Sequence, residues 1–403
     1  MKTKTKLTEI GEIPEDWEVA RLVNIITFVK GKKAEKLNGS ENGLPYLSTE
    51  YLRNNKAPEL VKITNNIILA NDGDLILLWD GSNAGEFFIG KKGVLSSTMV
   101  KFEFKNNNVD KTFLFYFLKT KEKILSLKTR GTGIPHVDKS VLENLKILLP
   151  QFPEQHAIAQ VLSAVDEAIQ KVNEIIAKTE RLKRGLLHRF FKKEHENEKF
   201  VQLSTIFDVE NGTTPSTREK KYWDGATINW ITPVDLGKLD GKMTIEESER
   251  KISHIALKEV NLTLLPKGTI ILSTRAPVGH LAILKKESTF NQGCKGLVPK
   301  NASKINVHYY GYYLLMEKYN LQNKAGQSTF KELSTTLLKK FEVPEININK
   351  QNNIVKILST VDQKLALEDK KKEKLERVKK GLMSDLLTGR KRVNIEKILV
   401  VEK

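Results

Sequence analysis

The sequence predicts an α+β (mixed α/β) protein with two pseudo-repeated globular units and two long helices that pair as an antiparallel coiled coil. The segment Gln155–Asp166 matches Gln351–Asp362 without a gap, at a constant offset of 196 residues. Both copies open a long stretch in which apolar residues alternate steps of three and four, as in a coiled-coil seam. Elsewhere, short apolar strands follow glycine turns. The predicted order is therefore unit, helix, unit, helix.

Two units also agree with the size of the chain. At 403 residues and 45.8 kDa it exceeds the usual domain of about 100–200 residues. We expect a globular unit over residues 1–150, a long helix over 151–193, a second unit over 194–344, a second helix over 345–388 and a tail over 389–403. Each helix is expected to start after a proline, Pro153 or Pro344.

The predicted helix seams would lie between the two helices or against a docked subunit. In the first helix the seam consists of Ile158, Val161, Val165, Val172, Ile175, Leu182 and Leu186, and in the second of Ile354, Ile357, Val361, Leu375, Val378 and Leu382. The middle of the second helix departs from this pattern, because Lys364, Glu368 and Lys371 fall on seam positions. We expect this part to face solvent or a partner protein.

The globular parts repeat more loosely. Residues 72–79 correspond to 267–274, each a glycine turn that leads into an apolar strand. Residues 131–134 correspond to 326–329, shortly before each helix. Helical stretches are expected over 111–127 and 307–319. The interiors of the two units differ, so the repeat does not extend to every segment.

Charge and cysteine content restrict the class of protein. The chain has 67 Lys and Arg against 49 Asp and Glu, a formal charge of +18, which favours a polyanionic partner. Its one cysteine, Cys294, excludes an internal disulfide and a cysteine-based zinc site. No apolar run approaches the ~18 residues of a membrane span, and the acidic residues that follow the basic N-terminus do not suit a signal peptide. We expect a cytoplasmic protein that has no membrane partner.

Motifs for catalysis are missing. Residues 85–92 resemble a phosphate-binding loop, but Lys92 stands where Ser or Thr would hold magnesium, and an ordinary hairpin explains the segment better. The histidines lack metalloprotease spacing, and Cys294 fits a small buried residue better than a nucleophile. We therefore predict no catalytic residues and no metal ligands on this chain, and the basic charge favours a binding function.

Several motifs together resemble the specificity subunits of type I restriction-modification systems. These are Ile13–Trp17, Asn211–Pro215, Gly225–Asp235, Leu265–Gly279, Asn291–Gly293 and the two helix starts. The resemblance covers nearly the whole chain, and the duplicated layout is itself a trait of that family.

The resemblance implies that each globular unit is a target recognition domain for one half of an asymmetric, bipartite DNA sequence. The helices would be the conserved spacers that set the distance between half-sites and dock two modification (methyltransferase) subunits. This chain would be non-catalytic and would hold no cofactor. Adenine methylation with S-adenosylmethionine would belong to the modification subunits, and ATP- and Mg-dependent translocation and cleavage to the restriction subunits.

Candidate DNA-binding residues are the polar and basic side chains around the predicted turns. In the first unit they are Lys30, Lys32, Lys33, Ser82, Asn83, Arg130 and Thr132. In the second unit they are Thr213, Thr214, Ser216, Arg218, Ser273, Thr274, Arg275, Lys324, Gln327, Ser328, Thr329 and Lys331. Lysines would mainly neutralise phosphates, whereas Arg275, Gln327 and Asn83 have the donor geometry for base edges. A structural role in a turn is the alternative at each position.

Two other functions remain open at this point. The chain could be the DNA-recognition portion of a fused restriction-methyltransferase, or an RNA-binding or scaffolding coiled-coil protein. Readout of individual bases depends on loop geometry and DNA shape as well as on residue types.

Overall fold

The computed structural model describes residues 4–37, 43–54, 56–130, 133–193, 199–239, 241–325 and 332–394. It divides into two compact units. Unit 1 comprises Met1–Asn173 and Lys370–Lys403, and unit 2 comprises Glu174–Asp369. Both boundaries fall inside a long helix, so each unit contains a globular part, the first half of one helix and the second half of the other.

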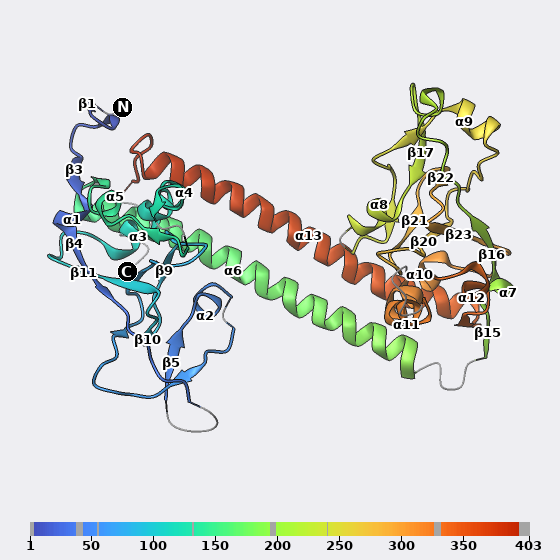
Figure 1. The fold of residues 1–403 in the computed structure, drawn as a ribbon, viewed down its shortest axis with the longest axis horizontal. Coiled ribbons are helices and arrows are strands. Elements are labelled where there is room, and N and C mark those ends of the chain that lie inside the picture. Colours follow the sequence, from blue (N-terminus) through green and yellow to red (C-terminus); the bar gives the residue numbers. More distant parts are fainter. Residues whose placement is uncertain are drawn as a thin grey trace. The chain divides into compact units, whose positions relative to one another are not determined.

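Unit 1 is built on two four-stranded sheets, which Figure 1 shows in blue and cyan. One has the order β4 (Ile26–Lys30), β11 (Met99–Phe104), β8 (Leu75–Leu78) and β9 (Phe87–Ile89). The other has the order β6 (Leu60–Val61), β5 (Leu44–Leu47), β10 (Gly93–Leu95) and β7 (Leu69–Ala70). The pairs β3 (Glu18–Arg21) with β14 (Lys146–Leu149), β1 (Thr5–Thr8) with β2 (Gly11–Pro14), and β12 (Thr129–Arg130) with β13 (His136–Val137) complete its strands. Its short helices are α1 (Leu22–Ile25), α2 (Thr49–Asn54), α4 (Glu122–Leu127) and α5 (Lys139–Glu143).

Unit 2 repeats most of this topology, with one strand more in its main sheet and one fewer in its second sheet. Its main sheet has the order β16 (Phe207–Asn211), β23 (Cys294–Pro299), β20 (Ile270–Ser273), β21 (Leu281–Leu284) and β18 (Thr244–Ile245). Its second sheet is β19 (Lys251–Ile252), β17 (Ile228–Ile231) and β22 (Ser288–Phe290), and β15 (Phe200–Gln202) pairs with β24 (Glu342–Pro344). The short helices are α7 (Leu203–Ile206), η2 (Lys220–Tyr222), α8 (Pro233–Gly237), α9 (His254–Glu259), α11 (Lys318–Lys324) and α12 (Thr335–Lys339). The predicted pair of similar mixed α and β units is thereby confirmed.

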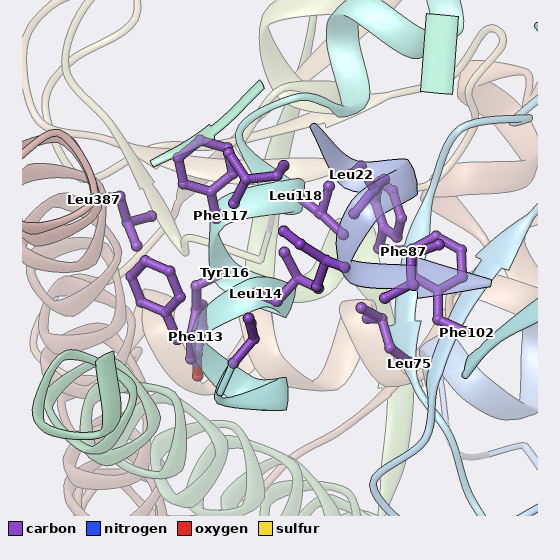
Figure 2. Close-up of a cluster of buried hydrophobic side chains, with 14 of the residues drawn as sticks. Leu22, Leu75, Phe87, Phe102, Phe113, Leu114, Tyr116, Phe117, Leu118 and Leu387 are labelled. Carbon is purple, nitrogen blue, oxygen red and sulfur yellow. The ribbon is translucent and has the colours of Figure 1, made fainter. Parts of the chain in front are cut away.

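In each unit one helix covers the main sheet and forms the centre of the core. In unit 1 this is α3 (Lys111–Lys119), whose N-terminus is capped by the Asp110 carboxylate at 2.9 Å from two backbone amides. Figure 2 shows Phe113 and Phe117 of α3 between the sheet residues on one side and Leu387 on the other. In unit 2 the equivalent is α10 (Val307–Met316), which lies against β21 (Figure 1).

The long helices are α6 (Phe152–His188, 37 residues) and α13 (Ile348–Leu386, 39 residues). α13 begins after Pro344 as expected, but α6 begins at Phe152, so Pro153 lies in its first turn and does not precede it. Proline is tolerated there because the backbone N–H groups of the first turn have no partner within the helix. At about 1.5 Å per residue each extends over roughly 55–60 Å. A π-helical turn, Arg189–Lys193, follows α6. No helix in the described ranges is long and apolar enough to cross a membrane.

Both long helices start with the same hydrogen-bond network. Buried Gln155 donates its side-chain amide to the Pro150 carbonyl at 2.9 Å, and its side-chain oxygen accepts from the backbone amide of Asp110 at 2.9 Å. Gln351 makes the equivalent bonds to Ile346 and Asn306 at 2.8 and 2.7 Å. The glutamine shared by the two sequence copies therefore fixes each helix start to its own globular part.

The predicted seam coincides only in part with the buried stripe between the helices. Ile158, Val165, Val172, Leu186, Ile354, Val361, Leu375 and Leu382 are buried or half-buried, as expected. However, Leu182 is 54% exposed, and Ile357 and Val378 are each 44% exposed. Leu162 and Leu358 are fully buried, whereas their predicted neighbours Val161 and Ile357 are half-buried and exposed. Counted from Ile158 or Ile354, the buried stripe advances by four residues and then by three, whereas the predicted seam advances by three and then by four.

The physical reason is that adjacent positions are both apolar, as at Val161 with Leu162 and at Ile175 with Ile176. Each phase then gives a continuous apolar stripe, and the sequence pattern alone does not choose between them. In the middle of α13, Lys364 and Lys371 are exposed and Glu368 is half-buried.

Candidate nucleic-acid interface

In unit 1, segments far apart in the sequence meet at one end of the main sheet. The backbone amide of Gly31, after β4, donates to Met99 at 2.9 Å, and that of Trp79, after β8, donates to Thr98 at 2.8 Å. The Trp79 carbonyl accepts from Val137 at 2.9 Å. The Lys30 ammonium lies 2.8 Å from the Asp80 carboxylate. The predicted segments around residues 30, 80 and 130 therefore form one continuous surface.

The same convergence occurs in unit 2. The amide of Thr213, after β16, donates to the Phe290 carbonyl at 3.1 Å, and the amide of Thr274, after β20, donates to Gly293 at 2.8 Å. Thr274 in turn accepts from the amide of Leu333 at 2.9 Å. The repeat in the sequence gives these segments equivalent positions, and the structure brings them together twice. We call these two surfaces the loop faces of unit 1 and unit 2.

A glycine makes each loop face possible. A Cβ atom on Gly31 would collide with the backbone oxygens of Leu95 and Ser96, and one on Gly212 with the backbone oxygen of Asn291. Only glycine permits such close approach of two backbone segments. Gly31 and Gly212 are matched repeat positions in the sequence, and this packing explains why the same residue stands in both.

On the loop face of unit 1, most predicted side chains are accessible. Lys32, Lys33, Ser82 and Asn83 are exposed, and the Lys32 ammonium lies 2.6 Å from the Asn66 side-chain oxygen. Arg130 has 68% of its side chain exposed while its Nε lies 2.5 Å from Asp138, the N-terminal cap of α5. Thr132 lies outside the described residues.

On the loop face of unit 2, Thr213, Ser216 and Arg218 are exposed. The Thr214 hydroxyl accepts from Asn291 at 3.1 Å. Arg275 is 45% exposed and pairs with Glu332 at 3.1 Å. Lys324, at the end of α11, is exposed and 6.0 Å from the Phe341 ring. Gln327, Ser328, Thr329 and Lys331 lie outside the described residues.

Ser273 and Thr274 correct the sequence prediction, because both are 0% exposed. The Ser273 hydroxyl donates to the Pro277 carbonyl at 2.5 Å and accepts from the His280 amide at 3.0 Å. The Thr274 hydroxyl donates to Gly293 at 3.2 Å. Their hydrogen-bonding capacity is used inside the unit, so they hold the loop in place and are not available to a ligand.

Sequence reasoning missed Lys295. It is paired in register with Asn211 at the end of β16, at the place where Val100 pairs with Lys30 in unit 1. The basic residue of this pair therefore lies on β4 in unit 1 and on the neighbouring strand, β23, in unit 2. Lys295 is only 8% exposed, and this burial lowers the pKa of its ammonium. The register of the two repeats is the signal that would have identified it.

The two loop faces carry different charges at matched positions. In unit 1 an isolated bridge joins Asp80 and His136, and in unit 2 the equivalent bridge joins Arg275 and Glu332. Unit 2 also stacks the Arg250 guanidinium over Trp223, 4.0 Å from the ring centroid. The same backbone scaffold therefore presents different donors and acceptors in the two units.

Among the described residues, no group of three or more His, Cys, Asp or Glu could hold a metal ion. Cys294 is buried, and desolvation raises the pKa of its thiol to about 12, which keeps it protonated. The chemistry on offer at the loop faces is hydrogen bonding and charge, which suits recognition of a polar, anionic ligand.

Comparison with known proteins identifies the family. The model of the type I restriction modification DNA specificity domain matches residues 14–181 and 195–377, one copy for each globular part. The chain belongs to this family. It is a specificity subunit of a type I restriction-modification system with two recognition domains.

Relatives support the assignment, one of them over most of the chain. The type I restriction enzyme MjaVIII specificity subunit of Methanocaldococcus jannaschii is 36% identical, with 94% of each chain covered. The EcoR124I/EcoR124II specificity subunit of Escherichia coli is 28% identical over 38% of this chain and 37% of its own length. The crystal structure of the S subunit from M. genitalium has a TM-score of 0.65 at 19% identity, with 96% of this specificity subunit and 99% of that chain covered. At 19% identity this likeness shows a shared fold and nothing more.

Proposed function

We propose that each unit of this specificity subunit binds one half of an asymmetric, bipartite target in double-stranded DNA through its loop face. The observation that carries the proposal is the convergence, in both units, of the same separate loop segments on one surface. Two equivalent loop faces suit a DNA duplex, because the two strands of a duplex are related by a two-fold axis. Different side chains at matched positions, such as Asp80 and Arg275, predict different half-sites.

The exposed side chains divide into two roles. Lysines such as Lys32 and Lys33 neutralise phosphates and supply affinity that depends on salt but little on sequence. Arg275 and Asn83 supply donors in the fixed geometry that base edges require. The overall excess of +18 favours a polyanionic partner such as DNA, while base choice rests on a few arginine and uncharged side chains.

The long helices act as the spacer and as the docking site for two modification subunits. A helix of roughly 55–60 Å corresponds to about one and a half to two turns of duplex at about 3.4 Å per base pair. This chain contributes recognition and no catalysis. The modification subunits use S-adenosylmethionine for adenine methylation, and the restriction subunits use ATP and Mg.

Methylome sequencing of cells with and without this gene, both carrying the modification subunits, tests the proposal. We expect a bipartite, asymmetric adenine-methylation motif that disappears with the gene. An unchanged methylome would overturn the proposal and favour RNA binding or scaffolding. Replacing residues 11–149 by the first recognition domain of another family member should change one half of the motif only.

A further inference from the structure

Each unit contains one Tyr–Asp–Lys network, and the two networks are copies of each other. In unit 1 the Tyr116 hydroxyl donates to one oxygen of Asp166 at 2.8 Å, and the Lys379 ammonium lies 2.6 Å from the other. In unit 2 the Tyr312 hydroxyl donates to Asp362 at 2.6 Å, and Lys183 lies 2.6 Å from its second oxygen. Tyr116 and Asp166 correspond to Tyr312 and Asp362 at the offset of 196. Lys183 and Lys379 also correspond at this offset, but each pairs with the aspartate of the other repeat copy.

The three members of each network come from three different elements. Tyr116 lies on α3, the core helix of the globular part, and Asp166 lies on the first half of α6. Lys379 lies on the second half of α13, which reaches unit 1 from unit 2. The network therefore joins the core helix of the globular part to the first half of α6 and to the second half of α13, the long helix of the other repeat copy.

Both lysines occupy seam positions of their helices. Lys183 follows Ile176 and Thr179 in the four-and-three pattern, and Lys379 follows Leu375 in the same way. Only 20% of the Lys183 side chain and 27% of the Lys379 side chain are exposed. The two ammonium groups also lie 5.9 and 5.5 Å from the ring centroids of the tyrosines in their networks.

A charge in an apolar seam costs stability unless it is paired, and this makes it a register determinant. Leucine and isoleucine in the seam tolerate a slip by seven residues. A slip in one direction would keep a lysine, Lys372, opposite Asp166, but it would place Ile176 opposite Asp362. A slip in the other direction would place Leu386 and Phe190 opposite the two aspartates. Of these three registers, which all keep the heptad phase, only the observed one pairs both aspartates with lysines.

We propose that the two networks are register locks, which fix the pairing of α6 with α13 and so determine which half-site spacing the subunit accepts. The inference rests on the proposed role of the helices as the spacer. One heptad corresponds to about 10 Å along a helix, or roughly three base pairs of duplex. The three residues of each lock are positioning residues and need not touch DNA.

The lock itself is tested on the full chain without DNA, by replacing both lysines with methionine (K183M with K379M). Spin labels at Ala164→Cys and Lys370→Cys, two exposed sites in unit 1 on opposite helices, report the register through pulsed electron paramagnetic resonance. Cys294 is 0% exposed and remains unlabelled. We expect one distance for the parent and a second population, displaced by about 10 Å along the helix axis, for the variant.

A matched control removes the same charge from exposed positions, by K178M with K374M. These lysines are also repeat counterparts, and both are exposed outside the seam. The control should keep the single distance. Reversing one pair, by D166K with K379E, provides a second variant that should again favour one register. A single unchanged distance in the K183M and K379M variant would overturn the lock.

The effect on half-site spacing is tested with the complete methyltransferase complex. Its methylation is measured on a panel of duplexes whose spacer differs by up to three base pairs from the target established by methylome sequencing. We expect the lysine variant to lose at least tenfold of its preference for the natural spacer, and the control to keep it. A register change in the labelled chain without any change in spacer preference would overturn the role of the helices as the spacer. An unchanged register would overturn only the lock.

Discussion

The guanidinium of Arg392 lies 2.7 Å from the Glu154 carboxylate, although 238 residues separate them in the sequence. Glu154 is 1% exposed and also accepts from the indole nitrogen of buried Trp17 at 3.0 Å. Arg392 reaches Asp16 as well, at 2.7 Å. The segment after α13 is thus fixed against the start of α6 and against the N-terminal strands of unit 1.

Removing this arginine is expected to destabilise unit 1. Arg392→Met would leave the Glu154 carboxylate buried without its cation, which costs about 2–4 kcal/mol in comparable sites. The measurement is thermal and urea unfolding of the full chain, followed by hydrogen exchange at unit 1 amides. Glu154→Gln keeps an acceptor for Trp17 and removes the charge, so adding it to Arg392→Met should recover part of the loss. A wild-type transition for Arg392→Met would contradict this account.

Acid should weaken the same contact. The hydrogen bonds from Arg392 outweigh desolvation and lower the pKa of Asp16 from its ordinary value of 3.8. The unfolded chain therefore takes up this proton at higher pH than the folded chain. The stabilisation is present above about pH 4 and is lost as the pH falls through the lowered pKa. Between pH 5 and pH 3 the midpoint of unit 1 unfolding should fall more steeply for the parent than for Asp16→Asn, and parallel curves would argue against it.

Two glycines at the end of α13 should respond in opposite directions. Gly389 has a φ of +72°, and a Cβ there would lie 2.5 Å from Pro14, so Gly389→Ala should destabilise unit 1 by about 1–3 kcal/mol. Gly381 lies within the helix, and a Cβ there would have no neighbour within 4 Å among the described residues beyond the helix's own backbone. Gly381→Ala should therefore stabilise by roughly 0.5–1 kcal/mol. Unfolding midpoints measure both, and equal shifts would show that the contact with Pro14 does not matter.

Arg275 should determine base preference in one half-site. Arg275→Ala is expected to weaken DNA binding by the complex by about 1–3 kcal/mol and to relax discrimination at one position of the second half-site. Fluorescence anisotropy with base-substituted duplexes at fixed salt is the measurement. Ser273→Ala is the control, because its buried hydroxyl affects stability and not the surface. Identical base preferences in Arg275→Ala and the parent would remove Arg275 from the readout.

Lys33 should act on every DNA sequence alike. It is exposed on the loop face of unit 1, and Lys33→Ala should reduce affinity uniformly and lower the slope of log affinity against log salt by about one. A salt titration with specific and non-specific duplexes measures both effects. If the loss is confined to one base sequence, Lys33 contacts a base rather than a phosphate.

Much of the architecture could be predicted because the chain is duplicated. The offset of 196 between Gln155 and Gln351 located both long helices, since a regular helix preserves residue spacing. The loop segments of the interface were found as turns in matched positions. Ser273 and Thr274 looked equally suitable by residue type, but burial depends on the loop that closes over them, which the strand sequence does not contain.

By itself the sequence determined the repeat, the order of unit and helix, and the start of each helix to within a few residues, because these depend on local spacing and on turn residues. Tertiary structure decided the phase of the seam, since Val161 and Leu162 are both apolar and only packing selects between them. It also decided the pairing of Asp166 with Lys379 and of Asp362 with Lys183. Those contacts join distant segments, and their energy depends on shared burial that no single segment encodes.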